Sequence, residues 1–544
     1  KSSITFFVPP ERSISKYKDE EETEGEWGWV GPGSSSISEE EILKMSNSWV
    51  AAQIDKFKQK DIFIKGPTSE GLANSLENAV KKQPEKFVED LEPFINTGFY
   101  YVYHIIDGFK DAWKEKTSFD WTKVLSFIER YIDRTDFWKN KLVGRSGFYN
   151  ADNKWIVGAI GELIEEGTRN DEWSIPADNF SSIKKIFSLI ANSVPKDEKD
   201  SDNFPSHVLN CGLGKVITGL VYFILRIARL EKTNDRPVWD KELKSIFETF
   251  LSRNIYDTYT VLGEYLISFA YLDKEWTKNQ IETLFMTKDK VMWDAFMSGY
   301  LTASRVNLNL YKLMKKHYIR GLSYDFDEKI LNERLIDHIG IAYLNGEETI
   351  EGDGLLKMLW NKWNSERIKA LIDYFWTQRD NLIEKSDESE LNTQMKARII
   401  QFWRDLYEYY RSKEGLTKND KGILSEIAKL TIFIPEIDEE NYQWLMLSAL
   451  YIQEDYNSSY FLECLNTLKD KGDKLSTARK IGNIFLEILK SFKPDYDLGD
   501  IQSIVEHLYS QNNPEISDLA NDICNKYAQS GIEIVTDIYR KHNP

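Results

Sequence analysis

The chain has 544 residues, more than a single hydrophobic core ordinarily serves, so several domains or an elongated repeat array are expected. It carries 88 acidic and 70 basic residues, and the resulting net charge of −18 argues against general nucleic-acid binding because it repels a phosphate backbone. Its three cysteines, Cys211, Cys464 and Cys524, lie far apart, which is typical of reduced thiols in a cytoplasmic protein. No apolar run reaches the roughly 18 residues that cross a bilayer, so no membrane partner is expected.

The N-terminal region differs in composition from the rest. The chain begins KSSITFFVPP, without Met and without the regions of a signal peptide, and we expect it to be a fragment of a longer protein that could carry a catalytic domain elsewhere. Residues 1–37 combine an acidic run with Gly, Pro and Ser, which is typical of a linker or a loosely docked arm. At Ser38, a capping box with Glu41 predicts the first helix.

Helical periodicity dominates residues 38–544. Apolar residues recur at i, i+3, i+4 and i+7 in pieces of about 12 to 20 residues, and we expect about two dozen helices. One such piece begins at Asp120, which is expected to cap a helix whose first turn packs on Phe119. The buried stripe of this helix is expected to comprise Val124, Phe127, Ile128 and Tyr131.

Short helices joined by short turns favour an all-α fold, specifically an irregular α-solenoid of stacked helical hairpins of the HEAT or TPR-like kind. No strict repeat period is visible. We expect the main α-solenoid to span residues 38–414. Residues 415–544 are expected to form a C-terminal helical subregion, because the helices shorten there and no tryptophan follows Trp444.

The stretch SHVLNCGLGKVITGLVYFILRIARLEK, residues 206–232, begins like a phosphate-binding loop. Such a loop needs a Gly five residues before the Gly of its Gly-Lys pair and a Ser or Thr after the pair, but Leu209 and Val216 occupy these positions. The third glycine of a dinucleotide fingerprint is replaced by Ile217. We therefore expect a helix entry that binds no nucleotide, followed by a helix covered on several sides.

Two patterns resemble metal sites only in part. His207 and Cys211 lie four residues apart, as two zinc ligands can, but no nearby Cys or His completes a set of four. We expect them to be core residues at a helix start.

The second pattern is DYDLGDIQSIVE, residues 495–506. Asp495, Asp497 and Glu506 match calcium-loop positions, but Asp500 stands where the sharp turn of such a loop needs glycine. We expect Asp497 or Asp500 to cap a helix that begins near Ile501, and we expect no metal or other cofactor.

Carboxylate pairs at helical spacing, such as Glu162 with Glu166 and Glu347 with Glu351, are expected by chance in so acidic a chain and are interpreted as solvated faces. No nucleophile with an evident base is found, and neither a Gly-x-Ser-x-Gly elbow nor a His-Glu-x-x-His pair occurs. No catalytic residue is therefore expected, and the chain is not expected to be an enzyme.

One charged feature is a candidate contact surface. The segment LNLYKLMKKHYIRGL, residues 308–322, would place four basic residues on one face of a single helix and Tyr311, Met314 and Tyr318 on another. The basic stripe comprises Lys312, Lys315, Lys316 and Arg320. It could be a solvated face, could contact an acidic segment of the same chain, or could bind an acidic partner protein or, less favourably, a nucleic acid.

Four segments, in this order along the chain, resemble the long helical region that follows the nucleotide-binding domain in large bacterial STAND-type NTPases, the class that includes the Avs antiphage sensors. They are SEGLANSLENAVKKQPEKF, FDWTKVL, LNCGLGKVITGLVYFILRIARL and WDAFMSGYL, between about Ser69 and Trp376. The positions that carry the resemblance are Gly71, Leu72, Phe87, Asp120, Trp121, Asn210, Gly214, Trp293, Phe296 and Leu301.

The resemblance implies a sensor region that recognises a phage protein, for example a structural or packaging protein, over a large surface. It also implies that binding drives self-association of an NTPase domain outside this chain and activates an effector. The leading hypothesis is thus a non-enzymatic recognition module of a cytoplasmic bacterial defence protein. The alternatives are a structural scaffold that assembles a host complex and, third, an enzyme with an unrecognised site.

Overall fold

The computed structural model describes residues 34–57, 66–141, 151–195, 211–231, 237–303, 306–352, 354–362, 364–384 and 389–544. These residues form 28 α-helices, three 3₁₀ helices and one π-helix, and no strand occurs among them. The prediction of an all-α fold is confirmed. Residues 1–33 of the predicted arm lie outside the described residues.

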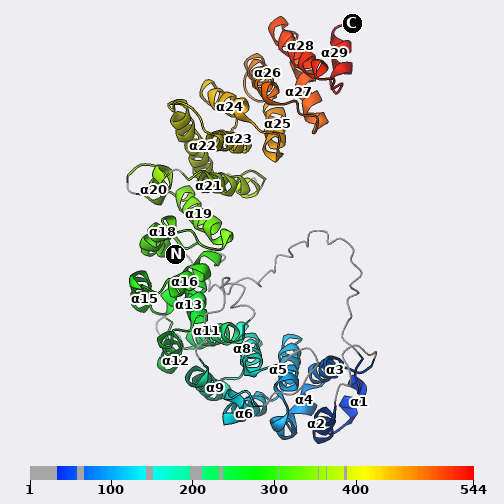
Figure 1. Cartoon of the computed structure of the whole chain (residues 1–544), viewed down its shortest axis with the longest axis vertical. Coiled ribbons are helices and arrows are strands. Elements are labelled where there is room, and N and C mark those ends of the chain that lie inside the picture. Colours follow the sequence, from blue (N-terminus) through cyan, green and yellow to red (C-terminus); the bar gives the residue numbers. More distant parts are fainter. Residues whose placement is uncertain are drawn as a thin grey trace. The chain divides into compact units, whose positions relative to one another are not determined.

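The helices form two compact units, divided between Leu313 and Met314 (Figure 1). The first unit contains α1 (Glu39–Lys44), α2 (Asn47–Lys56), α3 (Ser69–Lys82), α4 (Pro84–Val88), η1 (Glu92–Asn96), α5 (Phe99–Lys114), α6 (Trp121–Ile132), α7 (Thr135–Trp138), α8 (Asn153–Arg169), η2 (Ala177–Asn179), α9 (Phe180–Ser193), α11 (Gly212–Leu230), α12 (Lys241–Ser252), α13 (Tyr256–Glu264), α14 (Leu266–Leu272), α15 (Lys274–Met286), α16 (Lys290–Thr302) and α17 (Leu308–Leu313).

The second unit continues the helical series. It contains α18 (Lys315–Leu322), α19 (Lys329–Leu344), α20 (Leu355–Lys362), α21 (Ser365–Thr377), η3 (Asp380–Glu384), α22 (Glu390–Arg411), α23 (Lys418–Glu426), η4 (Ile427–Phe433), α24 (Glu439–Tyr451), α25 (Tyr456–Leu468), α26 (Lys474–Ser491), α27 (Leu498–Ser510), α28 (Pro514–Gln529) and α29 (Thr536–His542).

In the first unit, one row of helices runs α3, α5, α8, α11, α13 and α16, each packed on the next, and a second row runs α6, α9 and α12. Aromatic side chains fill the space between elements. Trp113 stacks on Trp173 with ring centroids 4.4 Å apart and meets Trp121 edge-on at 5.0 Å. Rings at such distances contribute large buried apolar area, and Trp113 and Trp121 belong to the core.

Two pairs of helices in the first unit touch backbone to backbone. A Cβ atom added to Gly219 of α11 would lie 2.4 Å from the carbonyl oxygen of Gly161 in α8, and one added to Gly161 would lie 2.5 Å from the Cα of Val216. Between α13 and α16, a Cβ on Gly299 would lie 1.9 Å from a backbone oxygen. Such contacts are sterically forbidden, so only glycine permits this packing.

The stretch at residues 206–232 is therefore a packing element. Residues 206–210 lie outside the described residues, and α11 begins at Gly212 with Cys211 as its N-cap, whose Sγ accepts the Gly214 backbone N–H at 3.1 Å. The helix is covered on several sides, as predicted, with Val216, Ile217, Leu220 and Val221 all at most 1 % exposed.

From α22 to α29, most helices of the second unit stand in two rows (Figure 1). One row runs α22, α24, α26 and α28, and the other runs η4, α25, α27 and α29, with each helix packed on the next in its row. This repeated pairing lets every helix bury its apolar stripe on neighbours in both rows. The predicted boundary between residues 414 and 415 falls inside this unit, in the connection from α22 to α23, and stays a prediction.

Local capping determines where many helices begin. The predicted capping box is present, with Glu41 N–H donating to Ser38 Oγ and Ser38 N–H donating to Glu41 Oε2 at 2.8 Å. Asp120 caps α6 as predicted, and the predicted stripe of that helix is buried. In eight of the described helices the capping side chain is an Asp, so part of the negative charge serves helix N-termini.

The expectation of one helix over residues 308–322 is wrong. The structure has α17 and α18 with a turn at Met314, whose ψ is 0°. The segment contains no proline at the break, and Met314 is fully buried, so tertiary burial of this residue overrides the local helical pattern. Within the described ranges, every helix is too short or too polar to cross a bilayer.

Candidate recognition site

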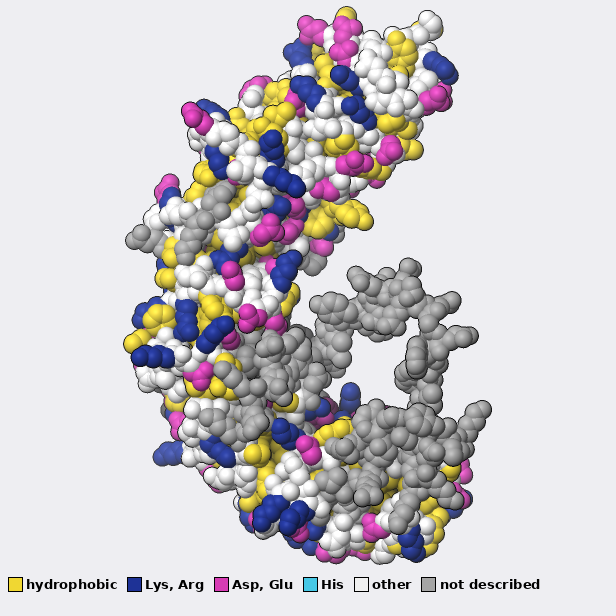
Figure 2. Space-filling view, in the orientation of Figure 1, with side chains coloured by type: hydrophobic (Ala, Val, Ile, Leu, Met, Phe, Trp, Pro, Cys, Tyr) yellow, Lys and Arg dark blue, Asp and Glu magenta, His cyan; other side chains and the backbone are white. Residues whose placement is uncertain are grey.

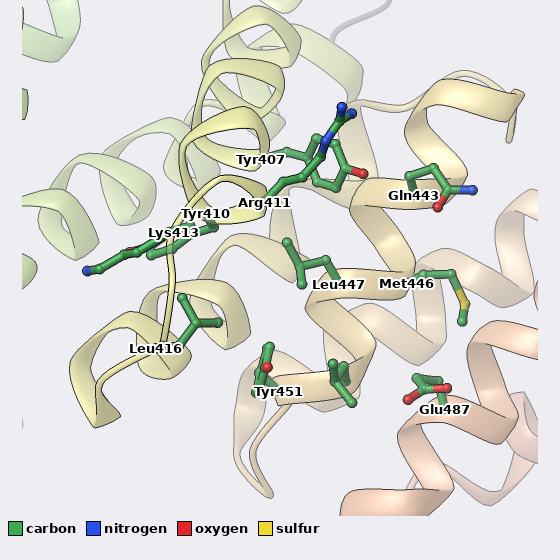
Figure 3. A pocket seen from close by; sticks show the side chains of 12 residues that line it. Tyr407, Tyr410, Arg411, Lys413, Leu416, Gln443, Met446, Leu447, Tyr451 and Glu487 are labelled. Atoms are coloured by element: carbon green, nitrogen blue, oxygen red, sulfur yellow. The ribbon is translucent and has the colours of Figure 1, made fainter.

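The second unit contains an open pocket of about 570 Å³ formed by α22, α24 and α26 (Figure 3). Tyr407 and Arg411 come from the last turns of α22, and Glu487 comes from α26. Tyr410 of α22 also lines the pocket, and the other lining side chains come from the α22–α23 connection and from α24; among them are Leu416, Gln443, Met446, Leu447, Leu450 and Tyr451. Each contributing helix is held by its neighbours in the stack, so the pocket is preformed.

Apolar and aromatic side chains line much of this pocket, which we call the aromatic pocket, and Arg411, Lys413, Gln443 and Glu487 line it too. Tyr407, Met446, Leu447 and Tyr451 are half-buried, and Leu450 is 40 % exposed. Burying a large apolar side chain contributes about 1.5–3 kcal/mol, and partly exposed aromatic and apolar groups in a concavity are where partner proteins gain most. The pocket volume lies within the range of about 300–1,000 Å³ that is typical of ligand pockets.

Two exposed cations flank the aromatic pocket. The guanidinium carbon of Arg411 lies 6.0 Å from the centroid of the Tyr407 ring, and Lys421 Nζ lies 5.4 Å from that of Tyr451. Arg411 also pairs with Glu408 at 3.3 Å, but both side chains are more than half exposed, and such pairs contribute little. Among the described side chains, Lys421 has no ion-pair partner.

The other charged groups at the pocket are already engaged. Lys413 Nζ donates to both carboxylate oxygens of Asp420, at 2.9 and 2.8 Å, and this hydrogen bond raises the pKa of Lys413. Lys413 accordingly points away from Leu447 and Met446 in Figure 3. Glu487 pairs with Lys490 at 2.8 Å. The rim of the aromatic pocket thus presents positive charge on an otherwise acidic protein.

A second cavity, of about 770 Å³, lies between α19 and α21 and reaches Glu426 of α23. It is strongly charged. Burial raises the pKa of Asp337 to about 6; Arg334, whose Nη1 lies 3.3 Å from Asp337 Oδ2, opposes this shift, while Glu333 and Asp373 add to it. The cavity therefore contains a carboxyl group whose pKa burial raises well above its ordinary value.

A buried cation anchors one side of this second cavity. Lys429, whose side chain is 5 % exposed, pairs with both Asp373 and Glu426. Burial raises the pKa of Glu426, and the hydrogen bond from Lys429 opposes that shift. Because the lysine neutralises two carboxylates from different helices, it ties α21 to α23.

The structure places the predicted basic stripe on two helices. Lys312 lies in the last turn of α17, in the first unit, whereas Lys315, Lys316 and Arg320 lie in α18, in the second. The three lysines are exposed and Arg320 is partly exposed, while Tyr311 and Tyr318 are buried as predicted. The basic residues thus do not form a stripe on one helix, and none of them lines either cavity.

The acidic residues of the segment that resembles a calcium loop each contact a different partner. Asp497 occupies the N-cap position of α27, which begins at Leu498. Its side chain makes no capping hydrogen bond, so the prediction that this side chain caps the helix is wrong. Its carboxylate accepts from Ser459, while Asp500 accepts from Asn466 at 2.6 Å. Glu506 binds Lys541 at 2.9 Å at the C-terminal end of the stack.

His207 lies outside the described residues, and the Cys211 S–H donates to Asp257 at 3.3 Å. No group of three or more His, Cys, Asp or Glu side chains that could hold a metal ion occurs within the described ranges. Glu162, interpreted as part of a solvated face, bridges Lys215 at 2.9 Å and Lys110 at 3.8 Å. The carboxylate joins α8 to both α11 and α5, so its role is structural.

The aromatic pocket was missed at the sequence level. Its residues span positions 407 to 487 and come together only through stacking of three helices. One local signal was present: α24, EENYQWLMLSALY, carries apolar residues on all sides, yet Leu450 remains exposed. A helix that is apolar on several sides and still leaves a leucine exposed is a sign of a partner surface.

No protein-family model matches the chain, and no curated protein matches it. The contacts of the aromatic pocket therefore have to carry any assignment of function.

Proposed function

We propose that the chain is a non-enzymatic protein-recognition module, and that the aromatic pocket of α22, α24 and α26 is its principal contact site. The observation that carries the proposal is the chemistry of this pocket. Tyr, Met, Leu and Arg side chains converge there on a preformed concavity, and aromatic residues, Met and Arg are the residues enriched in protein interfaces.

The stacked helices supply the second requirement for recognition. Each lining helix is packed on neighbours in its own row, so little ordering entropy has to be lost when a partner binds. Basic and acidic side chains alternate over much of the visible described surface in Figure 2, and such a mixed rim favours specificity over general adhesion.

The biological setting in this proposal rests on the sequence resemblance. Resemblance to the helical region of STAND-type NTPases of the Avs kind suggests a cytoplasmic bacterial defence protein whose ligand is a phage protein. In that setting, binding would favour an active arrangement of the longer protein, because the ligand must bind that arrangement more tightly than the resting one.

An affinity capture with the purified chain as bait tests the proposal. Lysates of infected and uninfected bacteria are each passed over wild-type bait, over Met446→Ala/Leu450→Ala bait and over Leu475→Ala bait. Leu475 is the matched control because it is an exposed leucine of α26, 44 % exposed against 40 % for Leu450, and it does not line the pocket.

The expected result is a viral protein that the wild-type and Leu475→Ala baits retain from infected lysate and the double variant retains at least about tenfold less. Host proteins retained equally from both lysates would support a scaffold and contradict the sensor. A viral protein retained equally by all three baits would contradict the aromatic pocket as the contact site.

A further inference from the structure

We propose that the aromatic pocket binds a protein segment in which one large apolar side chain lies within about one helical turn of a carboxylate. The apolar side chain would enter among Tyr407, Leu447 and Tyr451, and the carboxylate would pair with Arg411 or Lys421. This inference rests on the proposed function and specifies the ligand chemistry of the same site.

The apolar part of the ligand follows from the lining. Met446, Leu447 and Leu450 project from consecutive turns of α24, and Leu416 adds a fourth aliphatic group from the preceding connection. These four side chains offer no hydrogen bond, so a polar ligand group buried directly against them would be left unsatisfied. A Phe, Trp, Leu or Met side chain meets no such cost.

The acidic group of the ligand follows from the charged side chains beside the aromatic pocket. Arg411 and Lys421 are exposed beside the two tyrosine rings, the lining carboxylate Glu487 is paired with Lys490, and Asp420 is paired with Lys413. A ligand carboxylate can displace the weak, solvated Glu408 from Arg411 at little cost. A ligand lysine beside either of these cations would be repelled.

The aromatic pocket also favours a protein segment over a nucleic acid as its ligand. Tyrosine rings beside cations can stack bases, as in single-strand binding sites. Here aliphatic side chains line the pocket beside the rings and would face a polar base edge. The net charge of −18 repels a polyanion, whereas a single carboxylate experiences the local cations. We therefore favour a protein segment, and an oligonucleotide serves as the opposing probe.

The test begins with a random 12-residue peptide library displayed on yeast and panned against the full chain. The Met446→Ala/Leu450→Ala variant serves for counter-selection. Enriched peptides are then synthesised and their dissociation constants measured with wild-type chain, Arg411→Glu, Lys421→Glu and the control Lys526→Glu, an exposed lysine of α28. Circular dichroism melts establish that each variant is folded.

We expect enriched peptides to contain Phe, Trp, Leu or Met within four residues of Asp or Glu. Each charge reversal at the rim should weaken their binding about fivefold, and Lys526→Glu should leave it unchanged. Replacing the peptide carboxylate by the amide should cost a similar factor with wild-type chain, and it should not weaken binding to the charge-reversal variant of the cation that the carboxylate pairs with, because that pairing is already lost.

The inference is overturned if no peptide prefers wild-type chain over the double variant, if enriched peptides are basic, if binding is indifferent to both charge reversals, or if a 12-nucleotide oligothymidine competes with them. These results differ from a failure of the proposed function. Capture of a viral protein that depends on Met446 and Leu450 but shows no dependence on Arg411 or Lys421 would leave the recognition role intact and remove only the acidic specificity.

Discussion

The two units bring their helices together by different means. In the first unit, backbones touch at glycines: a Cβ on Gly219 or Gly299 would lie within 2.4 Å of a carbonyl oxygen of the facing helix. In the second unit, the atoms nearest to helical glycines are side-chain atoms: a Cβ on Gly340 would meet the Tyr374 ring at 2.5 Å, and one on Gly482 would meet Leu519 at 3.0 Å.

This difference bears on function. Where backbones touch, no space is left between helices for a ligand and the spacing is fixed by main-chain sterics. Where side chains separate two helices, the length of the side chains sets the distance between the helices. Concavities can then open between the ends of these side chains. Both cavities described above, including the proposed recognition site, lie in the second unit.

The largest expected effect tests the backbone contacts of the first unit. Gly299→Ala would place a methyl group 1.9 Å from the Thr260 carbonyl oxygen, and we expect a loss of about 3 kcal/mol or more in the free energy of unfolding. Gly482→Ala is the matched variant of the second unit and should cost less than about 1 kcal/mol, because the half-buried Leu519 side chain can move. Chemical denaturation followed by circular dichroism measures both, and equal losses would contradict the comparison.

The next effect concerns the buried lysine of the second unit. Lys429→Met removes the cation that pairs with Asp373 and Glu426, and we expect a loss of about 3 kcal/mol, since two carboxylates lose their partner. The control is Arg479→Met, which breaks an exposed pair with Glu515 and should cost less than about 0.5 kcal/mol. Denaturation midpoints compare the two variants. A near-neutral Lys429→Met would mean that this pair does not hold α21 against α23.

A smaller, pH-dependent effect is expected at Asp337. Because its folded-state pKa of about 6 exceeds the ordinary value of 3.8, the folded chain holds a proton that the unfolded chain has lost between these pH values, so stability falls as pH rises through this window. Asp337→Asn removes this penalty. The variant should be more stable than wild type by about 1 kcal/mol at pH 7.5, and the difference should vanish near pH 4. A difference that is the same at both pH values would show that the carboxyl is not destabilised by burial.

The smallest expected effect is at the basic residues of α18. Reversing both Lys315 and Lys316 to Glu should weaken binding of a captured protein ligand about twofold, because exposed rim charges contribute modestly. Isothermal titration with wild-type chain and the double variant measures the difference. Unchanged affinity would identify these lysines as part of the solvated surface.

Features set by neighbours in the chain could be predicted from the sequence. The capping box at Ser38, the cap at Asp120 and the buried stripe of α6 depend on contacts within one or two helical turns, and the structure has all three. Helical periodicity gave the all-α class for the same reason, since it reports which face of each helix is apolar. The break at Met314 could not be read this way, because no local breaker marks it.

The sequence by itself therefore determined the fold class and many helix beginnings, through propensity, periodicity and caps. Only the tertiary structure decided that Gly161 and Gly219 face each other across α8 and α11, and that Tyr407, Leu450 and Glu487 meet in one pocket. The physical reason is that these contacts join residues tens of positions apart. Their geometry depends on how far each helix advances along the stack and how closely its neighbour approaches, and a one-dimensional pattern of apolar residues does not specify either quantity.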